Sequence, residues 1–278
     1  MSAEIITSLQ NATVKRVVKL RNRRKRDAEG LMIIEGYREL RRAIDNQVPI
    51  QTVFFCPGLY IGENEPTLLR DAVNNGARRV EVSDRVFRKM AYRDRPEGLL
   101  ALAPIPETNL ADLAPKLSDE PFLVIVEGIE KPGNLGTMLR SADAAGADAV
   151  LVADAVTDIF NPNVVRASLG TLFARPVVTA SSREIHSWLA EREIPSFAAT
   201  PFGKARYTDV PMAAPCAIVI GSEQYGLSEL WMTEATKQVR IPMLGQADSL
   251  NAAQAATLLM FEVVRQSGRD KAPPPLPK

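Results

Sequence analysis

The chain has 278 residues, of which 46% are hydrophobic and 24% are charged. This length and composition predict two globular domains with buried cores and exclude a largely disordered chain. The net charge of +1 conceals an asymmetry, because residues 1–104 carry a net charge of +6 and residues 105–278 carry −5. The amino-terminal part is therefore expected to attract polyanions.

The cysteines, the histidine and the hydropathy pattern exclude several classes of protein. Cys56 and Cys216 lie in apolar runs, so we predict buried thiols and no disulfide scaffold. His186 is the single histidine, which excludes a site with several histidine ligands, and we predict an ordinary helix position for it. The sequence predicts no metal site, no membrane span and no secretion signal, and hence a soluble, cytoplasmic protein.

The first predicted element is a basic helix from Gln10 to about Arg26, capped by Asn11 or Thr13 and with a narrow inner face of Val14, Val17, Val18 and Leu20. Eight of the twelve residues 15–26 are basic and none is acidic. Such self-repulsion favours a nucleic-acid contact over a merely solvated helix face. The candidate RNA-binding residues in this helix are Lys15, Arg16, Arg23, Arg24, Lys25 and Arg26.

Alternating strands and helices then predict a small α/β domain that ends at residue 104. The expected strands cover residues 31–36, 51–56, 78–83 and 99–104, and the expected helices cover 37–46, 65–75 and 84–92. Prolines restrict themselves and their predecessors to extended conformations, and several follow this domain. We therefore predict a basic α/β substrate-binding domain over residues 1–104 and a linker over residues 105–118.

A second α/β domain is predicted over residues 119–268, because helical patterns separate most of its strands as a parallel sheet requires. Its expected strands cover residues 122–129, 148–153, 175–180, 195–200, 216–221 and 238–242. A last helix from about Ser249 to Gln266 is expected to pack on the sheet through Leu250, Ala253, Thr257, Leu258, Phe261 and Val264. Residues 269–278 are polar and rich in proline, which predicts a disordered tail.

Gly133 and Gly136 follow the strand at 122–129 and begin a helix of small residues. Their spacing does not match the G-x-G-x-x-G fingerprint of dinucleotide-binding proteins. By itself this turn fits a close-packed strand-to-helix connection as well as a nucleotide site. A nucleotide-dependent oxidoreductase is thus an alternative, which the missing fingerprint and the basic helix disfavour.

Three segments occur in an order and spacing typical of one enzyme family: PGNLGTMLRSADAAG at 132–146, IVIGSEQYGLS at 218–228 and IPMLGQADSLNAAQAA at 241–256. They resemble the three motifs of the SpoU (TrmH) branch of the SPOUT RNA methyltransferases. Those enzymes transfer a methyl group from S-adenosylmethionine to a ribose 2′-hydroxyl. Residues 158–177 also resemble a segment of that branch's ribosomal RNA enzymes, including the thiostrepton-resistance type.

The resemblance implies a fold, a cofactor and an assembly. The expected fold class is α/β, with a carboxy-terminal parallel-sheet SPOUT domain that contains a trefoil knot, preceded by a smaller α/β substrate-binding domain. The implied cofactor is S-adenosylmethionine, and the implied assembly is a homodimer with the active site at its interface. The implied substrate is 23S ribosomal RNA; a transfer RNA 2′-O-methyltransferase and a noncatalytic RNA-binding or ribosome-assembly protein are the alternatives.

The motifs also imply roles for individual residues. The family's catalytic positions fall on Asn134, Arg140, Glu223, Ser249 and Asn251, and its cofactor-contacting positions fall on Thr200, Gly221, Ile241, Met243 and Leu250. Arg140 is expected to hold the target phosphate and to stabilise the developing alkoxide, because a guanidinium is too basic to act readily as a base at neutral pH.

Structural alternatives to these roles remain open from the residues alone. Arg140 could pair with Asp143 on the surface of its helix, Glu223 could stabilise a helix amino terminus, and Ser249 could cap the last helix. Arg166, in the segment NVVRAS, is a further candidate phosphate contact, and a surface salt bridge is the alternative for it.

Overall fold

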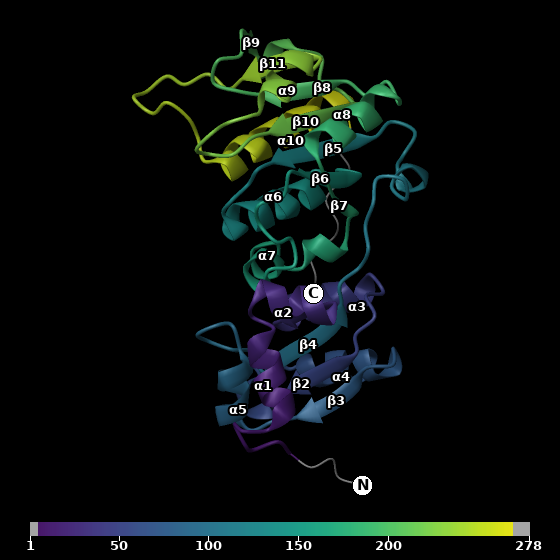
Figure 1. The fold of residues 1–278 in the computed structure, drawn as a ribbon, viewed down its shortest axis with the longest axis vertical. Coiled ribbons are helices and arrows are strands. Elements are labelled where there is room, and N and C mark those ends of the chain that lie inside the picture. Colours follow the sequence, from purple (N-terminus) through teal and green to yellow (C-terminus); the bar gives the residue numbers. More distant parts are fainter. Residues whose placement is uncertain (1–4, 269–278) are drawn as a thin grey trace. The chain divides into compact units, whose positions relative to one another are not determined.

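The computed structural model describes residues 5–268, and the predicted tail at 269–278 lies outside them. The chain divides into two compact units (Figure 1). The first comprises Met1–Glu107, Leu135–Arg140 and Thr157–Ala174, and the second comprises Thr108–Asn134, Ser141–Val156 and Arg175–Lys278. The first unit thus includes two segments that lie beyond the predicted boundary at residue 104.

A four-stranded mixed sheet forms the centre of the first unit, in the order β1-β4-β2-β3. Strand β4 is antiparallel to both of its neighbours, and β2 and β3 are parallel. Its elements lie close to the predicted ones: β1 (Leu31–Glu35), α3 (Tyr37–Asp45), β2 (Thr52–Phe55), η1 (Pro57–Leu59), α4 (Glu65–Asn74), β3 (Arg78–Glu81), α5 (Asp84–Met90) and β4 (Leu99–Pro104). One face of the sheet packs on α1 (Ala12–Lys19) and α5.

The predicted basic helix is interrupted and forms two helices, α1 and α2 (Arg23–Glu29). Asn11 caps α1 by accepting a hydrogen bond from the Thr13 amide at 2.8 Å. Asn22 caps α2 in the same way, accepting from the Arg24 amide at 2.9 Å. The prediction of one continuous helix is therefore wrong, because an asparagine side chain competes for backbone amides and starts a new helix.

Arg26 is buried, with 1% of its surface exposed, so its prediction as an RNA contact is wrong. Its guanidinium donates to the carbonyls of Leu20 at 2.8 Å and Arg21 at 2.9 Å, and it forms an ion pair with Asp158. The break between α1 and α2 frees these carbonyls from helical hydrogen bonds. Arg26 satisfies them and at the same time holds the 157–174 segment to this unit.

We predict that Arg26→Met lowers the free energy of unfolding by about 3 kcal/mol, because it leaves the Asp158 carboxylate without its cation. Urea denaturation measures this loss. Lys25→Met is the matched control, since Lys25 is exposed, and it should change stability by less than about 0.5 kcal/mol. Arg26→Met combined with Asp158→Asn should recover part of the loss; equal effects of Arg26→Met and Lys25→Met would contradict the prediction.

The described residues of the second unit form a seven-stranded parallel sheet in the order β7-β6-β5-β10-β8-β11-β9. The strands are β5 (Phe122–Glu127), β6 (Ala149–Ala153), β7 (Val177–Ala180), β8 (Ser196–Ala199), β9 (Ala205–Arg206), β10 (Cys216–Ile220) and β11 (Lys237–Arg240). The sequence predicted all of them except β9. The sheet order places β10 between β5 and β8; the knot stays a prediction.

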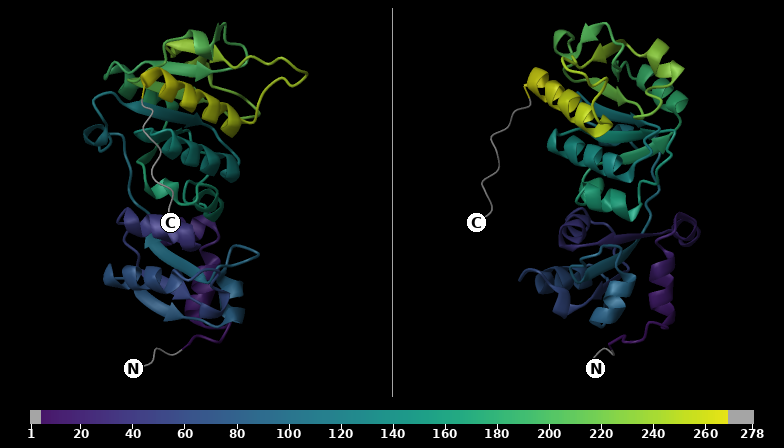
Figure 2. Two further views of the ribbon diagram at one scale, coloured as in Figure 1. Left: turned by 180° about the vertical axis from the view of Figure 1, so that it is seen from behind. Right: turned by 90° about the vertical axis from the view of Figure 1, so that its left-hand side faces the viewer.

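The helices that follow residue 108 are α6 (Pro132–Ala144), α7 (Pro162–Ala167), α8 (Ser182–Ala190), α9 (Glu229–Glu234) and α10 (Ala252–Ser267), with short turns η2 (Ala114–Lys116), η3 (Thr171–Phe173) and η4 (Tyr207–Asp209). Of these, α7 and η3 belong to the first unit, and α6 contributes residues to both units. The side chains of α8 and α9 pack on one face of the sheet. Leu113 of the predicted linker joins the same core and is buried. On the other face α6 and α10 run side by side (Figure 2), and Ser141 and Thr257 share a hydrogen bond of 2.7 Å.

Helix α10 differs from its prediction in its start and in its buried face. Asn251 is its cap and accepts from the amides of Ala253 and Gln254, so the alternative that Ser249 caps this helix is wrong. The predicted stripe is wrong in part, because Leu258 is 43% and Phe261 is 47% exposed. The buried face of the helix is rotated relative to the predicted stripe and includes three alanines. Its residues are Ala252, Ala253, Ala256, Leu259, Met260, Glu262 and Val263.

Candidate active site

A cavity of about 410 Å³ lies at the carboxyl ends of β8, β10 and β11. Its walls are the loops that follow these three strands, together with residues 248–250 at the entrance to α10. The carboxyl ends of parallel strands meet at one edge of a sheet, so loops far apart in sequence enclose one space there. The volume lies within the usual range of about 300–1,000 Å³ for small-molecule sites.

The predicted cofactor positions converge on this cavity. All five residues line it: Thr200, Gly221, Ile241, Met243 and Leu250. Sequence reasoning missed other lining residues, among them Phe202, Tyr225 and Asp248. Phe202 lies in the loop that follows a predicted strand, and Tyr225 and Asp248 lie within the second and third motif segments, at positions to which the resemblance assigns no role.

The loop after β10 is a tight hairpin that forms one wall of the cavity. Ser222 and Gly226 exchange two backbone hydrogen bonds of 3.0 Å, and the Ser222 hydroxyl accepts from the Tyr225 amide at 3.0 Å. A Cβ atom on Gly221 would lie 2.3 Å from the backbone of Gly226. Position 221 therefore admits only glycine without movement of the hairpin.

Glu223 projects from this hairpin and joins residues of all three sequence motifs. Its Oε1 accepts from the side-chain amides of Asn134 at 2.9 Å and Asn251 at 2.5 Å, and from the Ala252 backbone amide at 3.4 Å. Its Oε2 pairs with the Lys131 ammonium. Asn251 also donates to the Asn134 Oδ1 at 3.2 Å. The structure thus brings together three of the five predicted catalytic residues in one hydrogen-bonded network.

The network requires Glu223 to be ionised. The Lys131 side chain, as a hydrogen-bond donor, lowers the pKa of Glu223 below its ordinary value of 4.5, and the Asn134 side chain and the Ala252 amide act in the same direction. The bond to Ala252 places the carboxylate at the start of α10, where the helix dipole favours an anion. Glu223 therefore stabilises a helix amino terminus, as the structural alternative predicted, and also belongs to the network that joins the three motifs.

A second carboxylate, Glu127, anchors the end of the same loop and was missed by sequence reasoning. It is buried at the end of β5 and accepts from the hydroxyl of Ser182 at 2.5 Å, and from the hydroxyl and the amide of Ser228, both at 2.7 Å. Ser182 begins α8 and Ser228 precedes α9. The sequence signal that could have identified Glu127 is its position as an acidic residue at the end of the apolar run FLVIVE.

Arg140 is exposed and is not among the residues that line the cavity. It follows Asn134 by six positions on α6, which places it about 9 Å further along the helix axis and about 120° around it. Within residues 5–268 its side chain makes no hydrogen bond or ion pair. Asp143 pairs with Arg175 at 3.4 Å, so the alternative that Arg140 pairs with Asp143 is wrong.

The other predicted positions fall into two groups. Ser249 is exposed at the rim of the cavity, where it is one of the lining residues. The candidate RNA contacts other than Arg26 are exposed: Lys15, Arg16, Arg23, Arg24, Lys25 and Arg166. Of these, Arg16 pairs with Glu29 at 2.5 Å and Arg23 lies 3.6 Å from Asp27. Residues 15–26 contain no acid, and these two acidic partners, Asp27 and Glu29, follow directly after them.

The predictions for histidine and cysteine hold in the structure. His186 lies on α8, with an edge-on ring contact to Trp231 at a centroid distance of 5.8 Å. Cys56 and Cys216 are buried, and neither takes part in a disulfide bond. Across residues 5–268 no group of three or more His, Cys, Asp or Glu side chains could hold a metal ion. No helix in the described part of the chain is long and apolar enough to cross a membrane.

The fold and the cavity are those of an α/β protein that binds a ligand at the carboxyl edge of a parallel sheet. The family model of the SpoU rRNA methylases matches residues 121–261, and that of the MRM3-like substrate binding domain matches residues 11–101. A 23S rRNA (uridine(2479)-2′-O)-methyltransferase of Streptomyces viridochromogenes is 33% identical over 270 residues, which span 92% of this chain and 90% of that protein.

Two further comparisons agree. A 23S rRNA (guanosine(2553)-2′-O)-methyltransferase of Bacillus subtilis is 26% identical over 93% of this chain and 98% of its own. The crystal structure of an AdoMet-bound rRNA methyltransferase from Sinorhizobium meliloti has a TM-score of 0.84 and 30% identity, and covers 95% of this chain and 98% of its own. The chain therefore belongs to the SpoU rRNA methylase family. It is an S-adenosylmethionine-dependent RNA methyltransferase acting on ribose 2′-hydroxyls, as the motifs predicted.

The residues around the cavity fit this cofactor. Ile220, Val239 and Leu259 provide an apolar wall, and the three loops offer backbone groups for hydrogen bonding. The charged lining residues are the acids Glu223 and Asp248, which suit a ligand that carries a sulfonium and an ammonium group. The cavity can therefore hold S-adenosylmethionine without any metal ligand.

We predict that Lys131→Met raises the pKa of Glu223, because it removes the first cause of the present lowering. In the wild type the stabilising effect of the paired carboxylate is complete above the ordinary pKa of 4.5 that this carboxyl has in the unfolded chain. It is lost as the pH falls through the lower folded value, and Lys131→Met should shift that loss to higher pH. Carboxyl NMR titration of Glu223 measures this, with Lys116→Met, an exposed lysine elsewhere in the unit, as the control; an unshifted titration in Lys131→Met would contradict it.

Proposed function

We propose that this chain methylates a ribose 2′-hydroxyl of 23S ribosomal RNA. The support is the similarity, over nearly the whole chain, to two relatives named for that activity on 23S rRNA. Those relatives are named for different nucleotides, a uridine and a guanosine, so similarity does not select the position. A cytoplasmic location is proposed with it, because the proposed substrate is assembled into ribosomes there.

One observation carries the proposal that the site is catalytic rather than vestigial. The Glu223 network unites residues from the three motifs at the rim of a cavity of suitable size. A noncatalytic RNA-binding protein would have no need to keep four donors around one carboxylate. The noncatalytic alternative is therefore disfavoured.

Mapping of 2′-O-methylation in RNA from cells with and without the gene tests the proposed function. We expect one ribose methylation to disappear from 23S ribosomal RNA in the deletion strain and to return on complementation with the wild type. Loss of a methylation from transfer RNA instead would establish the alternative substrate. An unchanged methylation map for both RNAs would overturn the proposal.

We propose that the residues around the cavity divide the work of methyl transfer. The bound cofactor supplies the methyl group. Glu223 positions Asn134 and Asn251, and Ser249 at the rim orients the substrate or the charged end of the cofactor. A carboxylate has about four lone-pair sites, and four donors surround Glu223, so it has little capacity left to accept a proton from the ribose. Its role is therefore positioning rather than general base catalysis.

Arg140 is proposed as the group that holds the phosphate beside the target ribose and stabilises negative charge on the 2′-oxygen. It is exposed and without a partner among residues 5–268, so its guanidinium is available for a bidentate phosphate contact. The hydroxyl proton then passes to the phosphate, to water or to Arg140 itself. Alignment of the reacting atoms supplies the rest of the acceleration.

We predict that Arg140→Ala lowers the single-turnover methylation rate about a hundredfold or more, as expected for loss of a charge-stabilising group. Cofactor affinity, measured by calorimetry, should survive because Arg140 does not line the cavity. Arg140→Lys should rescue little, since a point charge does not reproduce a planar two-pronged contact. Arg183→Ala, an exposed arginine of α8, is the matched control; a wild-type rate for Arg140→Ala would move the assignment to another residue.

We further propose that the exposed basic residues of the first unit contact RNA phosphates. Lys15, Arg24 and Lys25 are the strongest candidates, because no acid pairs with them within the described residues, whereas Arg16 and Arg23 have acidic neighbours. Arg166 on α7 is exposed and is a further candidate. Contacts of this kind add affinity without reading the sequence.

A homodimer is proposed from the exposed apolar side chains of α10. Leu258 and Phe261 lie three positions apart on one face of this helix and are nearly half exposed. Exposed apolar groups that gather on one face indicate a partner surface. We expect sedimentation equilibrium to give a dimer for the wild type and a shift toward monomer for Phe261→Glu. A monomeric wild type would contradict this proposal.

A further inference from the structure

We propose that a basic edge of the second sheet, formed by Lys204, Arg206, Lys237 and Arg240, binds phosphates of the substrate RNA beside the cofactor cavity. The inference rests on the proposed function, because it deepens the description of how that RNA is held. The basic edge lies in the second unit, whereas the predicted RNA-binding residues lie mostly in the basic amino-terminal part of the chain. The net charge of −5 over residues 105–278 does not indicate such a basic edge.

The first observation is an unusual cross-strand pair. Strand β9 is the edge strand of the sheet, and its Arg206 is the register partner of Arg240 in the parallel strand β11. Register partners in adjacent strands lie about 5 Å apart and project from the same face. Like charges in this position are destabilising, so their presence calls for an anion that the chain itself does not supply.

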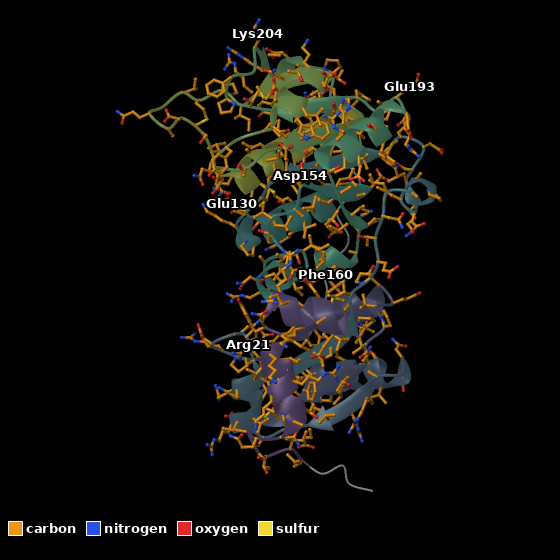
Figure 3. All side chains as sticks on the ribbon, viewed as in Figure 1. Arg21, Glu130, Asp154, Phe160, Glu193 and Lys204 are labelled. Atoms are coloured by element: carbon orange, nitrogen blue, oxygen red, sulfur yellow. The ribbon has the colours of Figure 1, made fainter. Side chains whose placement is uncertain are left out.

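The second observation is that these cations have no internal partner. Lys204, Arg206 and Lys237 are exposed and Arg240 is half-buried. Within residues 5–268 none of the four side chains makes a hydrogen bond or ion pair. Lys204 projects outward from the end of the sheet that carries β9 and β11 (Figure 3). Arg206 and Arg240 thus lie together at the carboxyl ends of β9 and β11, whereas Lys237 lies at the amino end of β11.

The third observation is the position of this edge beside the cavity. Arg240 lies between Val239 and Ile241, and Lys204 follows Phe202 by two positions; Val239, Ile241 and Phe202 line the cavity. Because side chains alternate along a strand, the Arg240 side chain leaves β11 on the face opposite to that of Val239, at the carboxyl end of the strand. Phe202 is 86% exposed. Cations beside an exposed aromatic ring are the usual combination for binding unpaired nucleotides, whose phosphates take the charges while a base stacks. The target ribose must enter this cavity, so its neighbouring phosphates need counter-charges near the rim.

Edge strands also carry charges for another reason, because charge prevents edge-to-edge aggregation. Strand β3, the edge of the other sheet, carries exposed Arg78 and Arg79. Charge on an edge is therefore not sufficient evidence. Two features distinguish the basic edge from β3. Arg206 and Arg240 are register partners in adjacent strands, and the loops that flank β9 and β11 also line the cavity. These features favour RNA binding.

The test compares two double variants that remove the same charge. Arg206→Gln/Arg240→Gln neutralises the pair, and Lys116→Gln/Arg183→Gln neutralises two exposed cations of the same unit away from the cavity lining. In vitro transcribed 23S ribosomal RNA is the probe for binding at several salt concentrations and for methylation kinetics. Calorimetry with S-adenosylmethionine reports whether each variant keeps an intact cavity.

We expect Arg206→Gln/Arg240→Gln to weaken RNA binding and raise the KM for RNA about fivefold or more, with cofactor affinity within twofold of wild type. Removal of one phosphate-binding cation should reduce the slope of log affinity against log salt by about 0.7 to 0.9. The control pair should leave the KM near the wild-type value. If Arg206→Gln/Arg240→Gln does not fold, Arg206→Gln alone, at the exposed member of the pair, should change the same quantities in the same direction by a smaller factor.

Two outcomes would overturn the inference. Equal effects of the two double variants would reduce it to general electrostatic attraction. Wild-type RNA affinity together with new self-association of Arg206→Gln/Arg240→Gln would show that the edge only prevents aggregation. Failure of the proposed function would give a different result, because the wild type would then methylate no 23S ribosomal RNA. The RNA affinities of the two double variants could still be compared in that case.

Discussion

The carboxylate of Glu223 is the interaction on which the arrangement of the site depends. It lies between the first turns of α6 and α10, and donors from both helix starts converge on it. Both helix dipoles favour a negative charge at this point, and the Lys131 ammonium adds a third favourable contribution. Two helices that are more than a hundred residues apart in the sequence are thereby fixed at their amino ends by one anion.

Glu127 performs the complementary task at the other end of the same loop. It is buried and fully engaged by Ser182 and Ser228, so the residues that follow the hairpin cannot move without breaking hydrogen bonds to a buried carboxylate. The hairpin between Ser222 and Gly226 is closed by its own backbone bonds. The cavity wall is thus held at both ends and in the middle, which preorganises it before any ligand enters.

The sequence predicted the elements whose physical signal is local. Strands β1, β5 and β10 are buried along their whole length, and a continuous apolar run is the expected signature of such strands. The burial of Arg26 could not be predicted, because it depends on Asp158, which lies 132 residues away. The inward face of α10 was equally hidden: apolar residues surround most of this helix, and close packing of its alanines on the sheet selects the face. Strand β9 has two residues and no pattern at all.

The second unit places acidic residues at the cavity and basic residues at the sheet edge, which fits a cationic cofactor and an anionic RNA. The charged residues among the described lining of the cavity are both acidic, Glu223 and Asp248, which suits a cofactor with a cationic sulfonium. An RNA phosphate needs the opposite sign, and cations inside the cavity would repel the cofactor. Arg240 of the sheet edge stands between the lining residues Val239 and Ile241 in the sequence and projects from the opposite face of β11, so its positive charge stays out of the cavity. Net charge averages over both and is therefore a poor guide to what this unit binds, whereas the local order of charges along β9 and β11 is informative.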